Sequence, residues 1–335
     1  MFAVSIIAGP VVDAGYLLPL LGIGSLLTVF GMFMTSICNE YWQVLLAQAI
    51  TMGLGFGCLY VTAPTIVSQY FDANTALAMG ASSAGSALGG VIYPIIFTQL
   101  QPRVGFGWAT RVVAFVVLAT SVPPLILMRA RLVPTTDYNL LDRTAFKDIP
   151  YCLLNVGLVF GFMGFYVIFY YIQLYGLEQR TVSPRIDNYL LDASSLPGRL
   201  IPGYYADRMG SMNVQTIVAL IGAVLTFCLI SIKSTAGLIV YCVLYGFSAG
   251  AFMGLPAAGV VSLSADKTKI GTRLGMTAVV GCGVLMSNPI AGAILNGKER
   301  WVGLIVWCGV LLVASSIVIV GSRALRVGFG LRRVL

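Results

Sequence analysis

The sequence lacks the residues from which most enzymes build an active site. It contains no histidine, which removes the commonest general base, metal ligand and proton shuttle. Only 10% of its 335 residues are charged, against the roughly 25% usual in a soluble domain. The 7 cysteines lie in apolar runs without a C-x-x-C pair, so neither a disulfide framework nor a zinc site is indicated. We expect no enzymatic activity, no cofactor and no bound metal.

The sequence is rich in apolar residues. Hydrophobic residues make up 58% of the chain, and the mean hydropathy is +0.92. Because about 20 apolar residues cross a bilayer as a helix, we predict an all-α polytopic membrane protein with about 11 transmembrane helices. The runs predicted to span the bilayer are Leu20–Cys38, Tyr41–Gln69, Ala76–Leu100, Trp108–Met128, Pro150–Leu177, Tyr189–Tyr205, Val214–Ile232, Gly237–Leu263, Gly271–Leu295 and Trp301–Ser322. Met1–Val12 is apolar but shorter, and we interpret it as the end of a span whose beginning is missing.

The net charge of +8 does not indicate a nucleic-acid partner, because the basic residues are spread over the connections without a dense patch. The larger share of them lies on the side of the longest polar connection, Arg129–Ile149, which favours a cytosolic linker and tail. The chain then divides into a truncated N-terminal transmembrane half (1–128), a cytosolic linker (129–149), a C-terminal transmembrane half (150–323) and a basic cytosolic tail (324–335).

Glycine, proline and aspartate recur in register after about 195 residues, which is typical of transporters built from two parallel repeats. The recurring residues are Gly9 and Asp13 as Gly203 and Asp207, Gly53 and Gly57 as Gly246 and Gly250, and Gly80 and Pro94 as Gly275 and Pro289. Such a duplication predicts a substrate site between the halves, near the middle of the membrane.

Arg199 is a charged residue inside the predicted transmembrane run Tyr189–Tyr205. An arginine at the centre of a membrane helix costs about 2.5–3.5 kcal/mol on insertion scales, so it is kept mainly where it faces a bundle interior or an aqueous path. Helical spacing places Asp192, Ser195 and Arg199 on one face. Arg199 either binds an anionic substrate group through its planar donor fork, or it snorkels to the surface or pairs structurally. Asp192 either joins this site or lies at the outer interface.

Two further features are candidates for lining a substrate cavity. Phe162, Tyr166 and Tyr170 recur at helical spacing on one face, where they line a cavity, pack in the core or contact lipid. Asn288 precedes Pro289 in an apolar run and offers a hydrogen bond to a solute.

The repeated corners are candidates for a gate. Glycine permits close helix approach, and an aspartate four residues later can cap a neighbouring helix or pair with a basic residue. We interpret the two corners as a cytosolic latch that opens when the halves rock, with a solvated turn as the alternative. The residues concerned are Gly9 and Asp13 in the first half and Gly203, Asp207, Arg208 and Gly210 in the second.

With these corners, the chain resembles the major facilitator superfamily, whose loop motif is G-x-x-x-D-R-x-G. The second half matches it fully, whereas in the first half Ala14 replaces the arginine and Gly15 comes one residue early. Within the superfamily the chain looks most like the fungal branch of the monocarboxylate transporter family. That resemblance rests on Tyr70-Phe71, Ala76-Leu77-Ala78-Met79-Gly80, Gly85, Gly198-Arg199, Pro202-Gly203 and Ile270-Gly271-Thr272-Arg273-Leu274-Gly275-Met276.

The resemblance implies that Arg199 binds the substrate carboxylate and that the first transmembrane helix is absent from this chain. An aspartate one turn before the arginine takes part in proton coupling in that family, and Ser195 holds that position here. We expect alternating-access transport of a small organic anion or secondary metabolite, with protons as the coupling ion, in the plasma membrane or an internal membrane such as the vacuole. The alternative is a truncated membrane protein that keeps the fold without transporting, as a sensor or pseudo-transporter.

Overall fold

The computed structural model describes the chain except residues 130, 132–140, 179–183, 265, 296–300 and 329–335 and the side chains of 184–188 and 327. The described residues form helices and connections, and no strand occurs among them. They separate into two compact units. Unit 1 consists of Met1–Asp72, Gly89–Asp142 and Asp266–Val279, and unit 2 of Ala73–Leu88, Arg143–Ala265 and Val280–Leu335.

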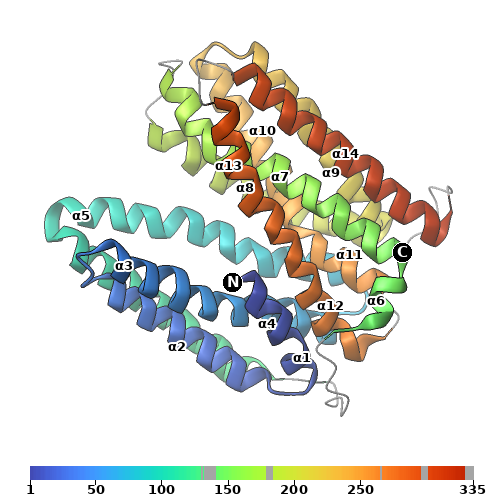
Figure 1. Ribbon diagram of the computed structural model, residues 1–335, viewed down its shortest axis with the longest axis horizontal. Coiled ribbons are helices and arrows are strands. Elements are labelled where there is room, and N and C mark those ends of the chain that lie inside the picture. The colour runs from blue at the N-terminus through green and yellow to red at the C-terminus, as the bar shows by residue number, and fades with distance from the viewer. Residues whose placement is uncertain (130, 132–140, 179–183, 265, 296–300, 329–335) are drawn as a thin grey trace. The chain divides into compact units, whose positions relative to one another are not determined.

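Unit 1 contains the helices of the first third of the chain together with a short helical segment from the second half. Its helices are α1 (Phe2–Asp13), α2 (Leu17–Thr35), α3 (Tyr41–Val44), the π-helix η1 (Leu45–Met52), α4 (Gly53–Tyr70), most of α5 (Thr75–Leu127), the 3-10 turn η3 (Lys267–Lys269) and α12 (Ile270–Thr277). α2 lies beside α4 (Figure 1). Their backbones meet at glycines, since a Cβ on Gly55 would lie 2.5 Å from Oγ1 of Thr28.

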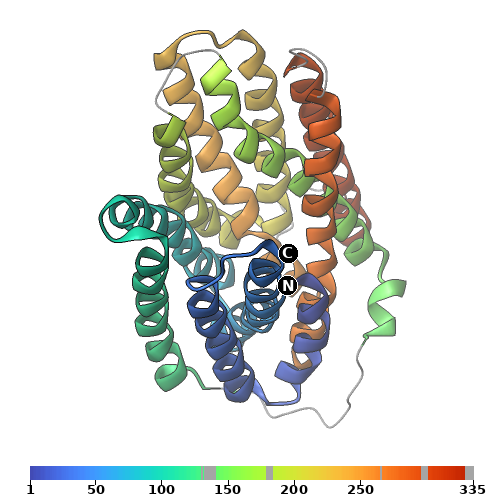
Figure 2. The same cartoon turned by 60° about the vertical axis from the view of Figure 1, so that its left-hand side comes forward.

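α5 holds two of the predicted spans in one element. At about 1.5 Å per residue, a helix of its length would be far longer than the roughly 30 Å core of a bilayer. Gly105 interrupts it with φ 78° and ψ 170°, a conformation that glycine adopts without strain. The chain therefore turns back between the predicted spans Ala76–Leu100 and Trp108–Met128, and Figure 2 shows the reversal.

Unit 2 contains the helices of the second half and the start of α5. Its other elements are α6 (Arg143–Lys147), α7 (Ile149–Glu178), α8 (Pro184–Met209), α9 (Ser211–Cys228), η2 (Leu229–Ser231), α10 (Thr235–Gly254), α11 (Pro256–Leu263), α13 (Gly281–Leu295) and α14 (Trp301–Val327), and η4 (Ala278–Val280) leads into α13. α14 packs along α7 and α9, and α8 packs along α10. In the core, the ring of Phe165 on α7 meets those of Phe252 and Tyr245 on α10, 4.9 and 5.6 Å away between centroids.

Small residues make room for these rings. A Cβ on Gly222 of α9 would lie 2.3 Å from the ring of Phe165, and one on Gly161 would lie 2.1 Å from that of Phe252. Interiors pack at the density of organic crystals, so a single added carbon at either glycine would displace a ring.

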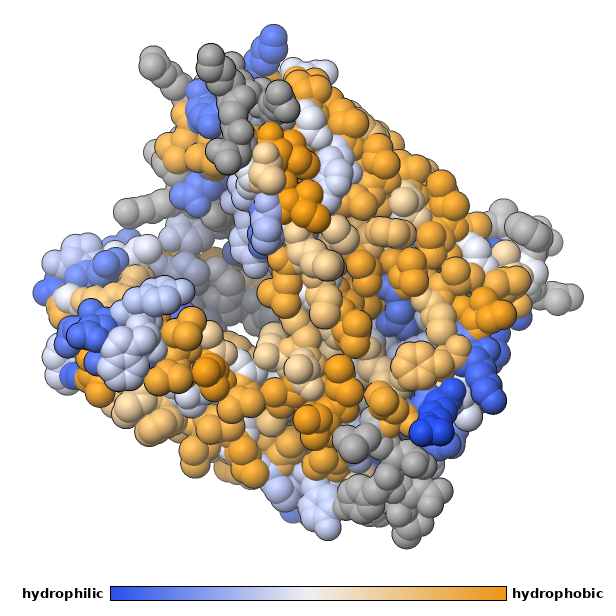
Figure 3. All heavy atoms as spheres, viewed as in Figure 1, coloured by the Kyte–Doolittle hydropathy of each residue, from blue (hydrophilic) through white to orange (hydrophobic). Residues whose placement is uncertain are grey.

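Apolar side chains also cover the outer face of α14. Those exposed along it recur at intervals of three, four or seven residues, which keeps them on one side of the helix, and Figure 3 shows the apolar surface over α14. They include Val302, Val306, Val310, Ile317 and Val320. Among the described residues, 8 helical stretches are long and apolar enough to cross a membrane. A surface of this kind suits a lipid environment, and the predicted all-α polytopic architecture is confirmed.

Candidate functional site

Arg199 lies on α8 among side chains from three other helices of unit 2. Its Nη1 donates to the backbone carbonyl of Ser83 and to the hydroxyl of Ser86, both on the first turns of α5. Its Nη2 lies 3.8 Å from the sulfur of Met253 on α10. Tyr166 of α7 and Asp192 of α8 are the titratable groups whose electrostatic influence reaches it. The residues that hold Arg199 therefore come mainly from outside its own helix.

The guanidinium keeps two donors without an oxygen partner. Its Nε is buried and forms no hydrogen bond among the described residues, and Nη2 has only the thioether of Met253. Neither of the two ion pairs in the described part of the chain includes Arg199. A guanidinium presents its donors in a fixed planar fork that matches a carboxylate with two parallel hydrogen bonds. The Nε and Nη2 edge is therefore the part of the guanidinium whose N–H groups donate to no oxygen among the described residues.

The other residues predicted on the same face behave differently. Ser195 is 2% exposed, and its hydroxyl donates to the carbonyl of Asp192, 2.7 Å away on its own helix. Its backbone packs on α10, where a Cβ on Gly250 would lie 2.3 Å from its carbonyl oxygen. The structure therefore brings Asp192 within electrostatic range of Arg199 but uses the hydroxyl of Ser195 within α8.

Aromatic rings form a row on α7. The centroids of Phe162, Tyr166 and Tyr170 follow one another at 5.8 Å, and the ring of Phe162 meets that of Phe252 at 5.6 Å. Tyr170 is 55% exposed and Tyr166 is partly buried, so the row leads from the interior to the surface of the unit. Flat aromatic faces of this kind suit an apolar or aromatic solute.

Asn288 lies on α13 and is not joined to Arg199 by a hydrogen bond. Its Oδ1 is buried and has no hydrogen-bond partner among the described residues. Its backbone carbonyl accepts from the hydroxyl of Tyr171, 3.4 Å away. A buried acceptor without a partner is costly, and a solute donor would satisfy it.

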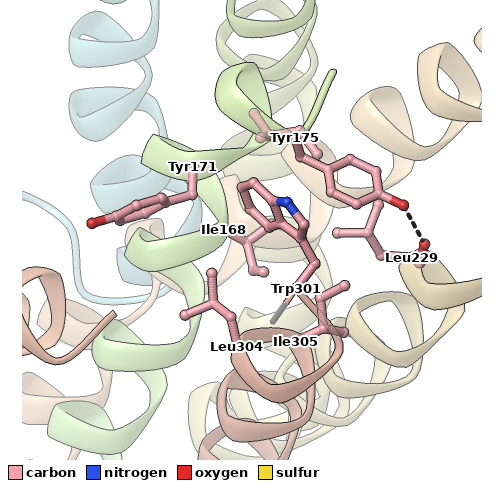
Figure 4. A pocket seen from close by; sticks show the side chains of 8 residues that line it. Ile168, Tyr171, Tyr175, Leu229, Trp301, Leu304 and Ile305 are labelled. Atoms are coloured by element: carbon pink, nitrogen blue, oxygen red, sulfur yellow. Dashed lines mark hydrogen bonds between the residues drawn. The ribbon is translucent and has the colours of Figure 1, made fainter. Parts of the chain in front are cut away.

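A small pocket lies at a different place in unit 2, between α7, α14 and η2 (Figure 4). Its walls are apolar and aromatic, and the hydroxyl of Tyr175 donates to the carbonyl of Leu229, 3.3 Å away. The residues that line it are Ile168, Tyr171, Ile172, Tyr175, Leu229, Trp301, Leu304 and Ile305. None of them is charged, so this pocket offers no counter-charge to an anion.

The corner at the end of α8 caps α5. The two carboxylate oxygens of Asp207 accept from the backbone N–H groups of Ala76 and Leu77, at 2.8 and 2.9 Å. These N–H groups belong to the first turn of α5, where a helix has unsatisfied donors and a partial positive charge. Gly203 allows the approach, since a Cβ there would lie 3.0 Å from the carbonyl oxygen of Ala76.

The corner at the end of α1 makes the same contact in unit 1. Asp13 accepts from the N–H groups of Gly271 and Thr272 at 2.9 and 2.7 Å, and from the hydroxyl of Thr272 at 2.7 Å. Gly271 and Thr272 stand in the first turn of α12, and a Cβ on Gly9 would lie 2.3 Å from the carbonyl oxygen of Gly271. Each aspartate thus caps the helix that begins at the equivalent position of the other repeat.

The two corners differ in how the helix ends. α8 continues to Met209 and stops at Gly210, with φ 91°, whereas α1 stops at Asp13 and Gly15 follows with φ 89°. Positive φ values favour glycine, which explains a glycine at both places and its one-residue offset. Arg208 does not join the cap. Its guanidinium lies 4.4 Å from the centroid of the Tyr204 ring.

A buried ion pair adds to the contacts of α12. Nε of Arg273 donates to Oδ2 of Asp142, 3.2 Å away, with side-chain exposures of 11% and 4%. Asp142 ends the described part of the linker before α6, so the linker is attached to the helix that Asp13 caps. The Gly-Thr-Arg stretch at 271–273 therefore serves two carboxylates. The remaining ion pair, Lys267 with Asp72, is exposed.

Comparison with known proteins places these features in a family. The model of the Major Facilitator Superfamily matches residues 1–289. The chain belongs to the major facilitator superfamily. The MFS-type transporter dbaD of Emericella nidulans is 40% identical over 95% of this chain and 73% of its own length. The aspyridones efflux protein apdF of the same organism is 34% identical over 96% of this chain and 67% of its own length.

The fold agrees with that of solved transporters of this superfamily. The outward conformation of FucP superposes with a TM-score of 0.73 at 13% identity, over 96% of this chain and 86% of that one. The protein is therefore a multi-pass integral membrane protein of a transporter family, and it is not an enzyme. Its partner is a small molecule. The division into halves at 128 and 150 stays a prediction.

Proposed function

We propose that this chain exports an acidic secondary metabolite, or a related small organic anion, by alternating access coupled to protons. The observation that carries the proposal is the donor edge of Arg199, where Nε and Nη2 have no oxygen partner while Nη1 is held by α5. A carboxylate or enolate would bind along that edge by two charge-assisted hydrogen bonds. The relative that is named as an aspyridones efflux protein supports the outward direction.

The remaining predicted site residues take defined parts in this proposal. The row of Phe162, Tyr166 and Tyr170 would receive the apolar body of the solute, because stacked rings favour flat apolar groups. Asn288 would accept a hydrogen bond from a polar solute group. Asp192 would provide a carboxylate within electrostatic range of Arg199, where binding of a proton changes the charge balance of the site.

The two corner contacts would form the gate on the cytosolic side. Asp13 and Asp207 each cap a helix from the opposite half of the sequence, so a rocking motion of the halves would have to break both caps. Their charges interact with the N-terminal dipoles of α12 and α5, and each such interaction is worth about 0.3–1 kcal/mol or more when partly buried. The gate is thus held by contacts that are weak enough to open reversibly.

Transport of hippurate in proteoliposomes tests the proposal. Hippurate offers both a carboxylate and an aromatic ring, and its amide, hippuramide, is nearly isosteric but uncharged. We expect flux of radiolabelled hippurate that depends on the pH gradient and is lost in Arg199→Ala, with no flux of hippuramide. Arg326→Ala changes an exposed arginine at the end of α14 and serves as the matched control.

The outcomes are distinct. Equal flux in the wild type and in Arg199→Ala would remove the arginine from the mechanism. No flux of hippurate or other aromatic monocarboxylates by a correctly inserted chain would contradict the proposed substrate class.

A further inference from the structure

The contact between Arg199 and α5 gives Ser83 and Ser86 a role beyond the helix packing that their small size alone would indicate. The helical stretch from Gly80 to Gly90 consists of small residues apart from Leu88, and small residues usually serve close helix packing. Yet the hydroxyl of Ser86 and the carbonyl of Ser83 both face the guanidinium of Arg199 on α8. We propose that Ser86 is a positioning residue that orients the anion-binding edge of Arg199, an inference that rests on the proposed function.

The hydrogen bonds of Ser86 fix the polarity of this contact. Its hydroxyl donates its single proton to the carbonyl of Ser83, 2.9 Å away on the same helix. Toward Arg199 the hydroxyl oxygen can therefore only accept. Nη1 donates to both Ser83 and Ser86, so these three groups form a closed cycle of hydrogen bonds. The cycle occupies one end of the guanidinium fork.

Rotation of the guanidinium is restricted as a consequence. The group is planar, so fixing Nη1 fixes the direction in which Nε and Nη2 point. Those are the two donors that keep no oxygen partner. Close packing also fixes the backbone of Arg199. A Cβ on Gly80 would lie 2.3 Å from the carbonyl oxygen of Arg199, and a Cβ on Gly254 would lie 3.4 Å from the Cβ of Arg199. Ser86 then acts on the substrate through Arg199 without touching it.

Binding of hippurate to the purified full-length chain tests the positioning role. Substrate that binds only the folded state raises the melting temperature by an amount that grows with the logarithm of 1 plus the ratio of ligand concentration to Kd, so a titration gives an apparent affinity. We expect Ser86→Ala to weaken hippurate binding by roughly tenfold, the effect of one hydrogen bond to a charged group. Ser86→Thr keeps the hydroxyl and should restore the affinity. Ser82→Ala removes an exposed hydroxyl one residue before Ser83 and should bind like the wild type.

A second measurement does not depend on any substrate. Phenylglyoxal condenses with two nitrogens of an unhindered guanidinium, and mass spectrometry of the peptide that contains Arg199 measures its extent. Because the cycle occupies Nη1, we expect Arg199 to react several-fold faster in Ser86→Ala than in the wild type. Ser86→Thr and Ser82→Ala should react at the wild-type rate.

The two measurements separate the failure of each proposal. Hippurate binding that is lost in Arg199→Ala but unchanged in Ser86→Ala would overturn the positioning role and leave the anion site standing. No binding of hippurate by the wild type would count against the proposed substrate class, and the reactivity of Arg199 would then decide alone. Reactivity that is equal in Ser86→Ala and the wild type would overturn the positioning role.

Discussion

Replacement of Gly80 by alanine should loosen α5 from α8. A Cβ at this position would lie 2.3 Å from the backbone carbonyl oxygen of Arg199, where ordinary contacts begin at 3.4 Å. The obstacle is backbone, so the helices must move apart by about 1 Å, and overpacking of this kind costs about 1–3 kcal/mol. The 2.8 and 2.9 Å hydrogen bonds of Asp207 to Ala76 and Leu77 would then stretch beyond hydrogen-bonding range.

The same helix supplies a matched control. A Cβ on Gly85 would meet nothing within 4 Å, so Gly85→Ala gains the helix propensity of alanine without the clash. That propensity is worth about 1 kcal/mol, and both variants share it. The net cost of Gly80→Ala is therefore up to about 2 kcal/mol, which lowers the ratio of closed to open contact by up to roughly thirtyfold.

Hydrogen exchange followed by mass spectrometry measures this ratio. The amides of Ala76 and Leu77 should lose up to about thirtyfold in protection in Gly80→Ala, and should be at least as protected as in the wild type in Gly85→Ala. Equal protection in both variants would refute the reasoning, because it would mean that the added methyl group is accommodated without separation of the helices.

Three further predictions concern single charged residues. Burial raises the pKa of Asp13, at the end of α1, to about 6. Three hydrogen bonds to this carboxylate act in the opposite direction but are outweighed by the burial. The capped state then binds more protons than the open one between about pH 4 and 6, so acidification should increase exchange protection in the first turn of α12. Asp13→Asn should remove that dependence, and protection that falls on acidification would contradict it. Asp142→Ala removes the carboxylate that pairs with the buried Arg273 guanidinium and should give a clearly lower melting temperature. Asp72→Ala breaks an exposed pair and should leave it unchanged, so equal shifts would show that burial does not matter here. Arg199→Lys keeps the charge but loses the planar fork, so hippurate should bind at least about tenfold more weakly than to the wild type, and equal affinity would argue against a two-donor contact.

The helices and their membrane setting follow from the sequence because hydropathy is a local property. The predicted runs Leu20–Cys38 and Pro150–Leu177 lie almost entirely within α2 and α7, and the two runs joined in α5 are separated at Gly105. The repeat was visible as recurring glycines and aspartates. The repeat predicted that the corners at Asp13 and Asp207 are equivalent. Capping of a neighbouring helix by the aspartate was one of the two contacts expected there, and pairing with a basic residue was the other.

The partners of the predicted residues did not follow from the sequence. Ser83 and Ser86 stood in a stretch of small residues whose composition indicated packing, and only their three-residue spacing hinted at a shared polar face. Met253 gave no signal at all. Conversely, Ser195 lay at the right spacing for the face of Arg199, yet its hydroxyl bonds to the carbonyl of Asp192.

The sequence by itself determined that the chain is a duplicated helical membrane protein with one charge deep in an apolar segment. Both properties can be read from the order of the residues, because hydropathy depends on neighbours along the chain and the duplication is a spacing between residues. Only the tertiary structure decided that Asp207 caps α5, that Asp13 caps α12 and that α5 holds one end of Arg199. Those contacts join residues more than 100 positions apart. Such pairs are selected by how glycines let helices approach, and no local pattern of the chain records which helix will be the neighbour.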